Sequence, residues 1–306
     1  MKKIIILNAL CYLCNPIFTQ NSNLKGVVLN SQTNEPIIYA VVGLMKENRG
    51  ISTDEMGVFE LEDVNNQDTL LVSCVGFEKK ILPVSEYKEG KIRLIQVAFQ
   101  LPVLTVKPQQ SKNLIVNEFN AQDIKNFITT KLNDTVAMTQ IAQFFENPKG
   151  ATWFVRELNL VRAQHFPSSE NKAKFRIRFY GVEENGKPDG KDICEPVLVD
   201  NKKKVINIDL TKSNLIIPPK GLFVAIEWIK IKGNFNLLNI YKDGVFLKKD
   251  YSYKPFIGMT LSKYEINSVY RLDYKGIWQE NYKYSEKTKL ETIEYRKLAI
   301  SLKLSN

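Results

Sequence analysis

Residues 50–61 read GISTDEMGVFEL and lie between two runs of apolar residues that are typical of β-strands. The side chain of Asp54 can accept hydrogen bonds from backbone N–H groups that follow it, and Gly57 can adopt the positive φ of a tight reversal. Phe59 and Leu61 are two residues apart, so they point to the same face of a strand. The stretch therefore predicts a hairpin turn that leads into a half-buried strand. It provides too few oxygen ligands for a calcium site.

Short β-rich runs surround this turn from Leu24 to about Lys107. The runs KGVVLN, EPIIYAVVGLM and DTLLVSCVGF are separated by turn residues. In KIRLIQVAFQL, every second residue from Ile95 to Leu101 is large and apolar, which is the period of a half-buried strand. No run of helical length and period occurs here. We expect a small β-sandwich over residues 21–107.

The order of these motifs resembles the carboxypeptidase-regulatory-like domain, a transthyretin-like β-sandwich of exported proteins in Gram-negative bacteria. The matching positions are turn glycines and core residues: Gly26, Val28, Pro36, Ala40, Val42, Gly50, Thr53, Asp54, Gly57, Phe59, Asp68, Leu70, Val72, Ser73, Gly76 and Phe77. The resemblance covers the first third of the chain and implies a non-catalytic accessory module. The carboxypeptidase zinc site belongs to a separate catalytic domain, so the resemblance transfers no binding residue to this chain.

Residues 1–20 have the pattern of a secretory signal peptide. Lys2 and Lys3 precede a mostly apolar run that ends at Leu13, which is too short to span a membrane as a helix. Cys11 and Cys14 lie inside this segment, and a lipid anchor on one of them is the alternative to their removal. No later apolar stretch approaches membrane length. We expect an exported protein in the periplasm or at the outer cell surface, with no transmembrane segment in the mature chain.

The net charge of +10 comes mostly from lysines. The clusters at residues 202–204 and 248–249 are expected in turns rather than on a basic helix, so we expect no nucleic-acid binding. A solvated face, or weak attraction to an acidic surface, explains the charge instead. Only Cys74 and Cys194 follow the predicted signal peptide. We expect Cys74 to be a buried apolar thiol, with an interdomain disulfide as the alternative.

Residues 108–150 are predicted to connect two domains and to contain a short helix. Ile124, Phe127, Ile128 and Leu132 recur at helical spacing, and polar residues fill the other face. The turn sequence NPKG then ends this connector.

Strand patterns return over residues 151–306. The sequences KFRIRFYGV at 174–182 and VINIDL at 205–210 alternate between apolar and polar residues, and turn signals separate the runs. We predict a larger antiparallel β-sandwich of jelly-roll type. The fold class is therefore mainly β, with a transthyretin-like sandwich, a short helical connector and this second sandwich.

Several catalytic classes lack their residues. His165 is the only histidine, which excludes a zinc site built on two histidines, and no phosphate-binding or dinucleotide-binding motif occurs. A nucleophile pair of His165 with Ser168 or Ser169 lacks the G-x-S-x-G elbow. The acidic loop at 183–192 has a composition found in calcium loops, but its lysines favour a plain hairpin. We expect no enzyme, no metal and no cofactor.

Two features leave functional alternatives open. Glu227 lies within the apolar run FVAIEWI and is either an outward strand residue or an acid of a carboxylate-based hydrolase. The stretch SVYRLDYKGIWQENYKY at 268–284 contains the ligand-binding candidates Tyr274, Trp278 and Tyr282, since exposed rings stack on sugars or anchor proteins. We predict an exported binding or structural module that contacts an envelope protein or surface polysaccharide. The alternative is a carbohydrate-binding protein using the aromatic residues near Trp278, followed by the hydrolase.

Overall fold

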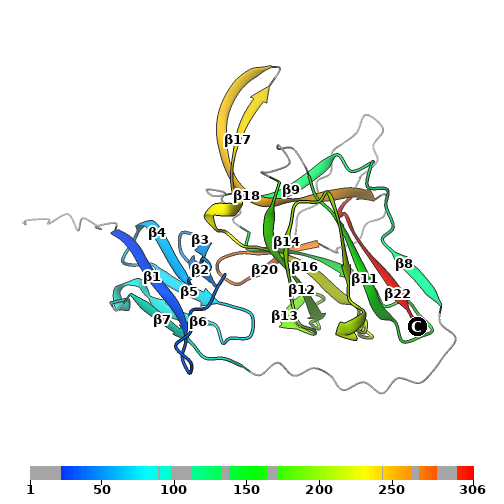
Figure 1. Cartoon of the computed structure of the whole chain (residues 1–306), viewed down its shortest axis with the longest axis horizontal. Coiled ribbons are helices and arrows are strands. Elements are labelled where there is room, and N and C mark those ends of the chain that lie inside the picture. Colours follow the sequence, from blue (N-terminus) through cyan, green and yellow to red (C-terminus); the bar gives the residue numbers. More distant parts are fainter. Residues whose placement is uncertain are drawn as a thin grey trace, which may run out of the picture.

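The computed structural model describes residues 22–88, 90–97, 112–131, 138–163, 171–242, 244–262, 269–280 and 295–306. Within these ranges the regular structure is almost entirely β-strand, so the predicted mainly β fold is confirmed (Figure 1). We call residues 22–97 the N-terminal domain and the described residues from 112 onward the C-terminal domain. Among the described residues, no helix has the length and apolarity that a membrane span requires. The predicted signal peptide lies outside the described residues.

The N-terminal domain is a sandwich of two small sheets. One sheet has the order β4-β1-β7, and the other has the order β3-β2-β5-β6. The strands are β1 (Ser22–Asn30), β2 (Val41–Leu44), β3 (Arg49–Ser52), β4 (Val58–Val64), β5 (Thr69–Ser73), β6 (Lys80–Pro83) and β7 (Lys91–Leu94), with a 3-10 turn η1 (Val84–Glu86). The pair β1–β7 is parallel and the other pairs are antiparallel. Apolar side chains of both sheets, among them Val28, Phe59, Val42 and Leu70, form one buried cluster.

The stretch GISTDEMGVFEL forms the predicted turn, but the turn does not close a hairpin. Asp54 Oδ1 accepts hydrogen bonds from the N–H groups of Met56 at 2.8 Å and Val58 at 2.9 Å. Gly57 has a φ of +71°, as the reversal requires. However, β3 and β4 belong to different sheets, so the turn carries the chain across the sandwich.

Thr53 explains why the chain leaves its sheet at this point. Its buried hydroxyl donates to the carbonyl oxygen of Ile37 at 2.7 Å and accepts from the N–H of Ala40 at 2.8 Å. The side chain therefore fixes the end of β3 to the segment before β2. From there the turn places Phe59 of β4 in the core from the opposite sheet.

The C-terminal domain is a larger sandwich of a seven-stranded and a four-stranded sheet. The larger sheet has the order β13-β12-β16-β10-β19-β20, with β14 also paired to β12, and the smaller has the order β15-β11-β22-β8. Their strands are β8 (Asn113–Val116), β10 (Gln140–Phe145), β11 (Phe154–Val161), β12 (Ala173–Val182), β13 (Pro188–Asp192), β14 (Val197–Asn201), β15 (Val205–Asp209), β16 (Leu222–Trp228), β19 (Val269–Leu272), β20 (Trp278–Glu280) and β22 (Ile300–Ser305). The main core of the protein lies between these sheets.

A further sheet joins the top of this sandwich in the view of Figure 1. Its order is β17-β18-β21, and β9 also pairs with β18. The strands are β9 (Asn126–Lys131), β17 (Phe235–Lys242), β18 (Val245–Ser262) and β21 (Tyr295–Leu298). The 3-10 turn η2 (Thr211–Ser213) lies between β15 and β16 in the chain, and η3 (Lys232–Asn234) lies between β16 and β17. The β17–β18 hairpin projects from the body of the molecule.

The predicted helical connector over residues 108–150 is wrong for its described part. Its residues form β8, β9 and β10, and the expected helix around 124–132 is largely strand β9. The run Ile128-Thr129-Thr130 is β-branched, which favours a strand. In addition, the long strand β18 provides an antiparallel partner, with Ile128 opposite Ile257. Tertiary pairing therefore overrides the helical spacing of the apolar residues.

Candidate functional site

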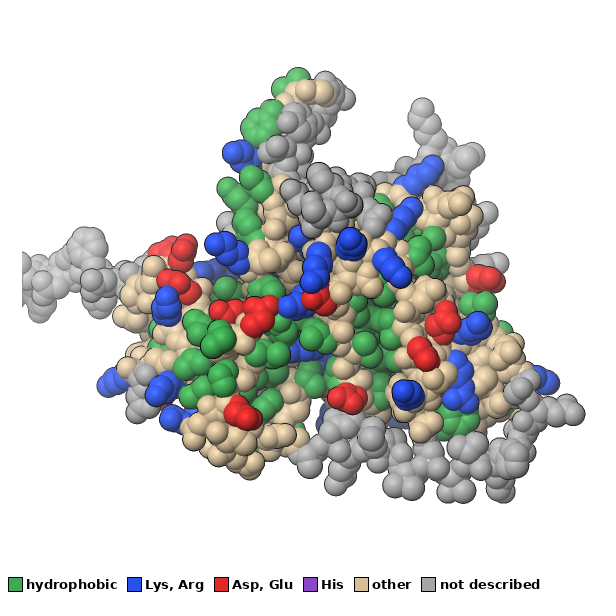
Figure 2. Space-filling model, viewed as in Figure 1, with side chains coloured by type: hydrophobic (Ala, Val, Ile, Leu, Met, Phe, Trp, Pro, Cys, Tyr) green, Lys and Arg blue, Asp and Glu red, His purple; other side chains and the backbone are tan. Residues whose placement is uncertain are grey.

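The alternation along β12 gives the larger sheet an apolar inner face and a charged outer face. Phe175 and Ile177 point into the core, whereas Arg176 and Arg178 point outward. The N-terminal domain lies against this outer face, so the charges are covered rather than solvated. Glu227 on the neighbouring strand β16 is only 2% exposed. Figure 2 shows acidic and basic side chains side by side where the two domains meet.

The buried charges form a balanced cluster of two arginines and two carboxylates. Glu227 contacts Arg176 at 3.3 Å and Arg178 at 3.8 Å. Arg178 also donates two hydrogen bonds to Asp192, at 3.0 Å from Nε and 2.5 Å from Nη2. Burial raises the pKa of Asp192 above its usual range, although Arg178 acts in the opposite direction. Each charge in the cluster has an opposite partner, which offsets part of the cost of taking the charges out of water.

The same face of β12 holds the N-terminal domain directly. Arg176 donates to the backbone carbonyl oxygens of Tyr39 at 3.1 Å and Ile38 at 3.3 Å. Lys174, two residues earlier, donates to the Tyr39 hydroxyl at 2.7 Å and to Glu55 at 2.8 Å. This hydrogen bond from Lys174 lowers the pKa of Glu55 to about 2. Glu55 belongs to the turn within residues 50–61, so that turn is also a docking element.

Tyr274 is the central aromatic contact between the domains. Its side chain is 1% exposed, its hydroxyl donates to the carbonyl oxygen of Gly50 at 2.8 Å, and its N–H donates to Asn48 Oδ1 at 3.1 Å. Gly43 and Gly50 are directly opposite each other in the β2–β3 pair. A Cβ added to Gly43 would lie 2.5 Å from the Tyr274 ring, and one added to Gly50 would also clash with the ring. The two glycines therefore form a flat platform for the ring.

A cavity of about 470 Å³ lies beside these contacts, between the two domains. Its volume is within the range of small-molecule sites. Trp278 is half-buried at the cavity and packs edge-on against Tyr180, with ring centroids 5.8 Å apart. Both domains contribute to the lining: Ser73, Cys74, Val75, Gly76, Phe77, Lys79 and Val97 from one, and Gln140, Arg178, Tyr180, Gly190, Lys191, Asp192, Glu227, Leu272 and Trp278 from the other.

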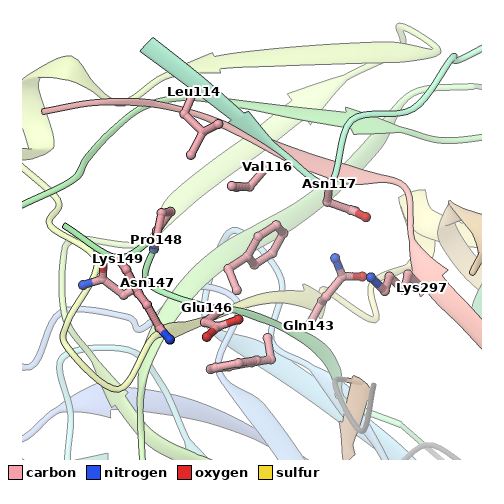
Figure 3. Close-up of a pocket in the computed structure, with 11 residues that line it drawn as sticks. Leu114, Val116, Asn117, Gln143, Glu146, Asn147, Pro148, Lys149 and Lys297 are labelled. Carbon is pink, nitrogen blue, oxygen red and sulfur yellow. The ribbon is translucent and has the colours of Figure 1, made fainter. Parts of the chain in front are cut away.

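A second hollow of about 510 Å³ opens at the edge of the C-terminal sandwich, between β8 and β10. Figure 3 shows Asn117, Gln143 and Lys297 on one side of it and Asn147 and Lys149 on the other. Gln143 accepts a hydrogen bond from the N–H of residue 298, and Asn117 donates to the carbonyl oxygens of residues 298 and 300. These amides therefore hold the junction of β21 and β22 in place. Because they already have structural partners, the interdomain cavity is the stronger candidate site.

The three ligand-binding candidates from the sequence have different positions. Tyr274 is buried between the domains, so in this structure it is not the exposed ring that we expected. Trp278 lines the cavity, four residues further on. Tyr282 lies outside the described residues. The pairing of Arg178 with Asp192 could not be read from the sequence, although the two arginines at alternate positions of KFRIRFYGV indicated a charged strand face that needs partners.

The structure also bears on the predictions for the cysteines, the acidic loop and a metal site. Cys74 is half-buried at the cavity and Cys194 is buried, and both are free thiols, so the alternative of an interdomain disulfide is not formed. The acidic loop at 183–192 is a hairpin, in which Glu183 N–H donates to the carbonyl oxygen of Lys187 at 2.9 Å. In the part of the chain that the structure describes, no group of three or more His, Cys, Asp or Glu residues could hold a metal. His165 lies outside the described residues.

Comparison with known families supports the assignment of the N-terminal domain. Residues 24–106 match the CarboxypepD_reg-like domain. The resemblance that the N-terminal motifs carry is thereby confirmed for the first third of the chain. The charged face of β12, the Tyr274 loop and Trp278 lie outside this match. No curated protein matches the chain.

Two solved structures have some similarity to the chain, each at 11% identity. One is the clostridial cysteine protease Cwp84, in a variant form after propeptide cleavage, with a TM-score of 0.37 over 80% of this chain and 53% of that chain. The other contains the cysteine protease and lectin-like domains of Cwp84, a surface layer associated protein of Clostridium difficile. Its TM-score is 0.38, over 88% of this chain and 59% of that chain. The chain thus spans less than two thirds of either structure.

Proposed function

We propose that the chain is an exported, non-catalytic binding module of the cell envelope, and that its ligand site is the cavity between the two domains. The observation that carries this proposal is that both domains line one cavity of about 470 Å³. Ligand sites occur preferentially at such domain interfaces. The signal-peptide pattern of residues 1–20 supports export. The CarboxypepD_reg-like domain supports an accessory role rather than a catalytic one.

The polar groups at the cavity support binding more than hydrolysis. A carboxylate-based hydrolase needs one acid that protonates the leaving group and a second carboxylate that attacks or activates water. Here Asp192 is held by two hydrogen bonds from Arg178, and Glu227 contacts Arg176 and Arg178. Proton transfer by either acid would disrupt a buried, charge-balanced cluster, at a cost of several kcal/mol.

Trp278 favours a carbohydrate as the ligand class. Its side chain lines the cavity, and Gln140, Lys191 and Asp192 contribute polar side chains to the same lining. Sugar sites combine an aromatic ring, which packs on the apolar face of a pyranose, with hydrogen-bonding groups for its hydroxyls. This arrangement makes a carbohydrate-binding module the more specific form of the proposal, and a protein partner is the other form.

The test is a glycan-array screen of residues 20–306, run with Trp278→Ala and with Ile277→Ala as the matched control. Ile277 is the neighbouring residue, is exposed, and is not part of the lining. We expect wild type and Ile277→Ala to bind the same glycan, and Trp278→Ala to bind about tenfold more weakly or worse, since loss of a central aromatic contact costs more than about 1.4 kcal/mol. Equal binding by all three proteins would remove Trp278 from the site.

If none of the three proteins binds a glycan, the carbohydrate form of the proposal is overturned and the protein-partner form is left. Crosslinking in the native envelope would then use a photoreactive group at Lys191, an exposed residue of the lining. A crosslinked protein partner that Trp278→Ala loses would support the interdomain site. Absence of any specific partner would overturn the proposal. Recovery of the full-length chain only in the cytoplasmic fraction would overturn export.

A further inference from the structure

The acidic side chains of the interdomain cavity are already paired. Asp192 accepts two hydrogen bonds from Arg178, at 3.0 Å and 2.5 Å. Glu227 contacts Arg176 at 3.3 Å and Arg178 at 3.8 Å. The two carboxylates and the two guanidinium groups therefore balance one another in charge. Among the described residues of the lining, a ligand that enters the cavity meets no unpaired negative charge.

Two lysines of the same lining have no acidic partner. Lys79 belongs to the wall that the N-terminal domain forms, and Lys191 lies in β13 on the opposite wall. Both side chains are exposed, and within the described part of the chain neither forms an ion pair or a side-chain hydrogen bond. The cavity therefore carries two ammonium groups in addition to the balanced cluster. An ammonium group donates hydrogen bonds and accepts none, so the pair favours a ligand with negative charge.

Trp278 provides a further hydrogen-bond donor near Lys191. A Cβ added to Gly190 would lie 3.8 Å from the indole Nε1, so this nitrogen lies close to the residue that precedes Lys191. No acceptor for the indole N–H occurs among the described residues. Gln140 adds an NH2 group, because its side-chain oxygen already accepts a hydrogen bond from the Tyr180 hydroxyl at 2.7 Å. These groups all donate, which suits the oxygen atoms of a carboxylate or a sulfate.

The position of the two lysines, and not the net charge of the protein, identifies the site. The net charge is +10, and Figure 2 shows basic side chains on both domains. Lys248 and Lys249, for example, lie in strand β18, not in the turn predicted from the sequence, and they are not part of the lining. Lys79 and Lys191 differ from these because they line one cavity from two domains, together with an aromatic ring.

We propose that the ligand of the interdomain cavity is an acidic saccharide, whose ring packs on Trp278 and whose acidic groups, carboxylate or sulfate, are bound by Lys79 and Lys191. The inference rests on the proposed binding function and names the ligand class of that site. A saccharide offers the indole an apolar ring face, and its acidic groups offer the lysines charged acceptors. Because the two lysines belong to different domains, the ligand contacts both walls of the cavity.

The test is a glycan array for residues 20–306 in which every acidic saccharide is paired with a neutral form of the same chain. Uronic-acid oligosaccharides are paired with their methyl esters, and sulfated oligosaccharides are paired with the desulfated chains. We expect the acidic member of a pair to bind, and its neutral form to bind about tenfold more weakly or worse. The kind of pair that responds distinguishes a carboxylate ligand from a sulfate ligand.

The variant Lys79→Gln/Lys191→Gln should bind the acidic glycan about tenfold more weakly, which is roughly 1.4 kcal/mol and within the range of two exposed ion pairs. Lys212→Gln/Lys220→Gln is the matched control, because it removes the same charge from two exposed lysines outside the lining. The control should bind like wild type. Raising the salt from about 0.1 M to about 1 M shortens the Debye length from about 10 Å to about 3 Å, so it should narrow the difference between wild type and the cavity variant. Both variants should keep the wild-type melting curve, because the substituted side chains are exposed.

The outcomes separate this inference from the proposed function. A neutral glycan that binds as tightly as its acidic form, and that Trp278→Ala loses, would overturn the inference and leave carbohydrate binding in place. Wild-type binding by Lys79→Gln/Lys191→Gln would also overturn it. Equal weakening by the two double variants would do the same, because general attraction to a basic protein would then explain the binding. If wild type binds no glycan, the carbohydrate form of the proposed function is overturned and the inference with it.

Discussion

Docking of the two domains depends on the close fit between Tyr274 and the platform of Gly43 and Gly50. We predict that Gly43→Ala destabilises the protein only because the Tyr274 ring is present. The added Cβ would lie 2.5 Å from ring atom Cδ1, and its three nearest neighbours are all atoms of this side chain. Gly43 is not among the glycines with a positive φ. The strain therefore comes from the ring and not from the backbone conformation.

The magnitudes follow from the two kinds of packing change. Gly43→Ala overpacks a buried contact, which costs about 1–3 kcal/mol. Tyr274→Ala removes a buried aromatic side chain, which costs about 3–5 kcal/mol, and it also deletes the hydrogen bond to the Gly50 carbonyl oxygen. In the double variant the methyl group added at position 43 occupies space that the ring has left. The double variant should therefore be no less stable than Tyr274→Ala. Its loss of stability would then be about 1–3 kcal/mol smaller than the sum of the two single losses, and this difference is the coupling energy.

The assay is urea unfolding of all four proteins, followed by circular dichroism and tryptophan fluorescence. Gly233→Ala is the control, since its added Cβ meets nothing within 4 Å, and it should cost less than about 1 kcal/mol. Near-additive losses in the double variant would refute the reasoning, because they would mean that Gly43 and Tyr274 do not share one contact. A Gly43→Ala protein as stable as wild type would refute it as well.

Two further predictions concern titrating groups, one at the same interface and one in the core of the C-terminal domain. Hydrogen bonding from Lys174 lowers the pKa of Glu55 from 4.5 to about 2. The ionised carboxylate therefore stabilises the folded protein fully above pH 4.5, and this contribution is lost as the pH falls through 2. Glu55 is mostly exposed, so the free energy of unfolding in urea should be higher for wild type than for Glu55→Gln by less than about 1 kcal/mol. This difference should close as the pH falls over that range, and a difference that stays constant would contradict the pairing. Burial raises the pKa of Cys194 to about 12, so mass spectrometry should show no maleimide on Cys194 of the native protein at neutral pH. Half-buried Cys74 should react slowly and its adduct should block ligand binding, whereas faster labelling of Cys194 would contradict the packing.

The local parts of the fold could be predicted from the sequence, because their causes are local. The Asp54 turn depends on hydrogen bonds that span two and four residues, and the pattern found it. Whether that turn closes a hairpin or crosses the sandwich depends on Thr53 and its contacts with residues 37 and 40, which no local pattern reveals. Residues 124–132 show the same limit, because their apolar spacing permits a helix and the partner that makes β9 a strand lies in β18, more than 100 residues away.

The candidate site was predicted less well than the fold, for a related reason. The aromatic stretch around Trp278 stays a prediction as a ligand site, and the sequence does not distinguish an exposed ring from one buried by another domain. Tyr274 packs on glycines more than 200 residues earlier in the chain. Alternation along β12 indicated a second, charged face, yet only the docked N-terminal domain explains why two arginines there require buried carboxylates.

The geometry of the 273–280 segment links domain docking to the proposed binding. Tyr274 anchors this segment to the N-terminal domain, and Trp278 of the same segment lines the cavity. Asp273 stiffens the connection between them, because its carboxylate accepts hydrogen bonds from the N–H of Ile277 at 3.1 Å and from Gln279 at 3.0 Å. A substitution that separates Tyr274 from the N-terminal domain is therefore expected to displace Trp278 and to open the cavity at the same time. A ligand that contacts both walls of the cavity binds more tightly when the domains are docked. Because coupling is reciprocal, the bound ligand stabilises the docked arrangement by the same free energy.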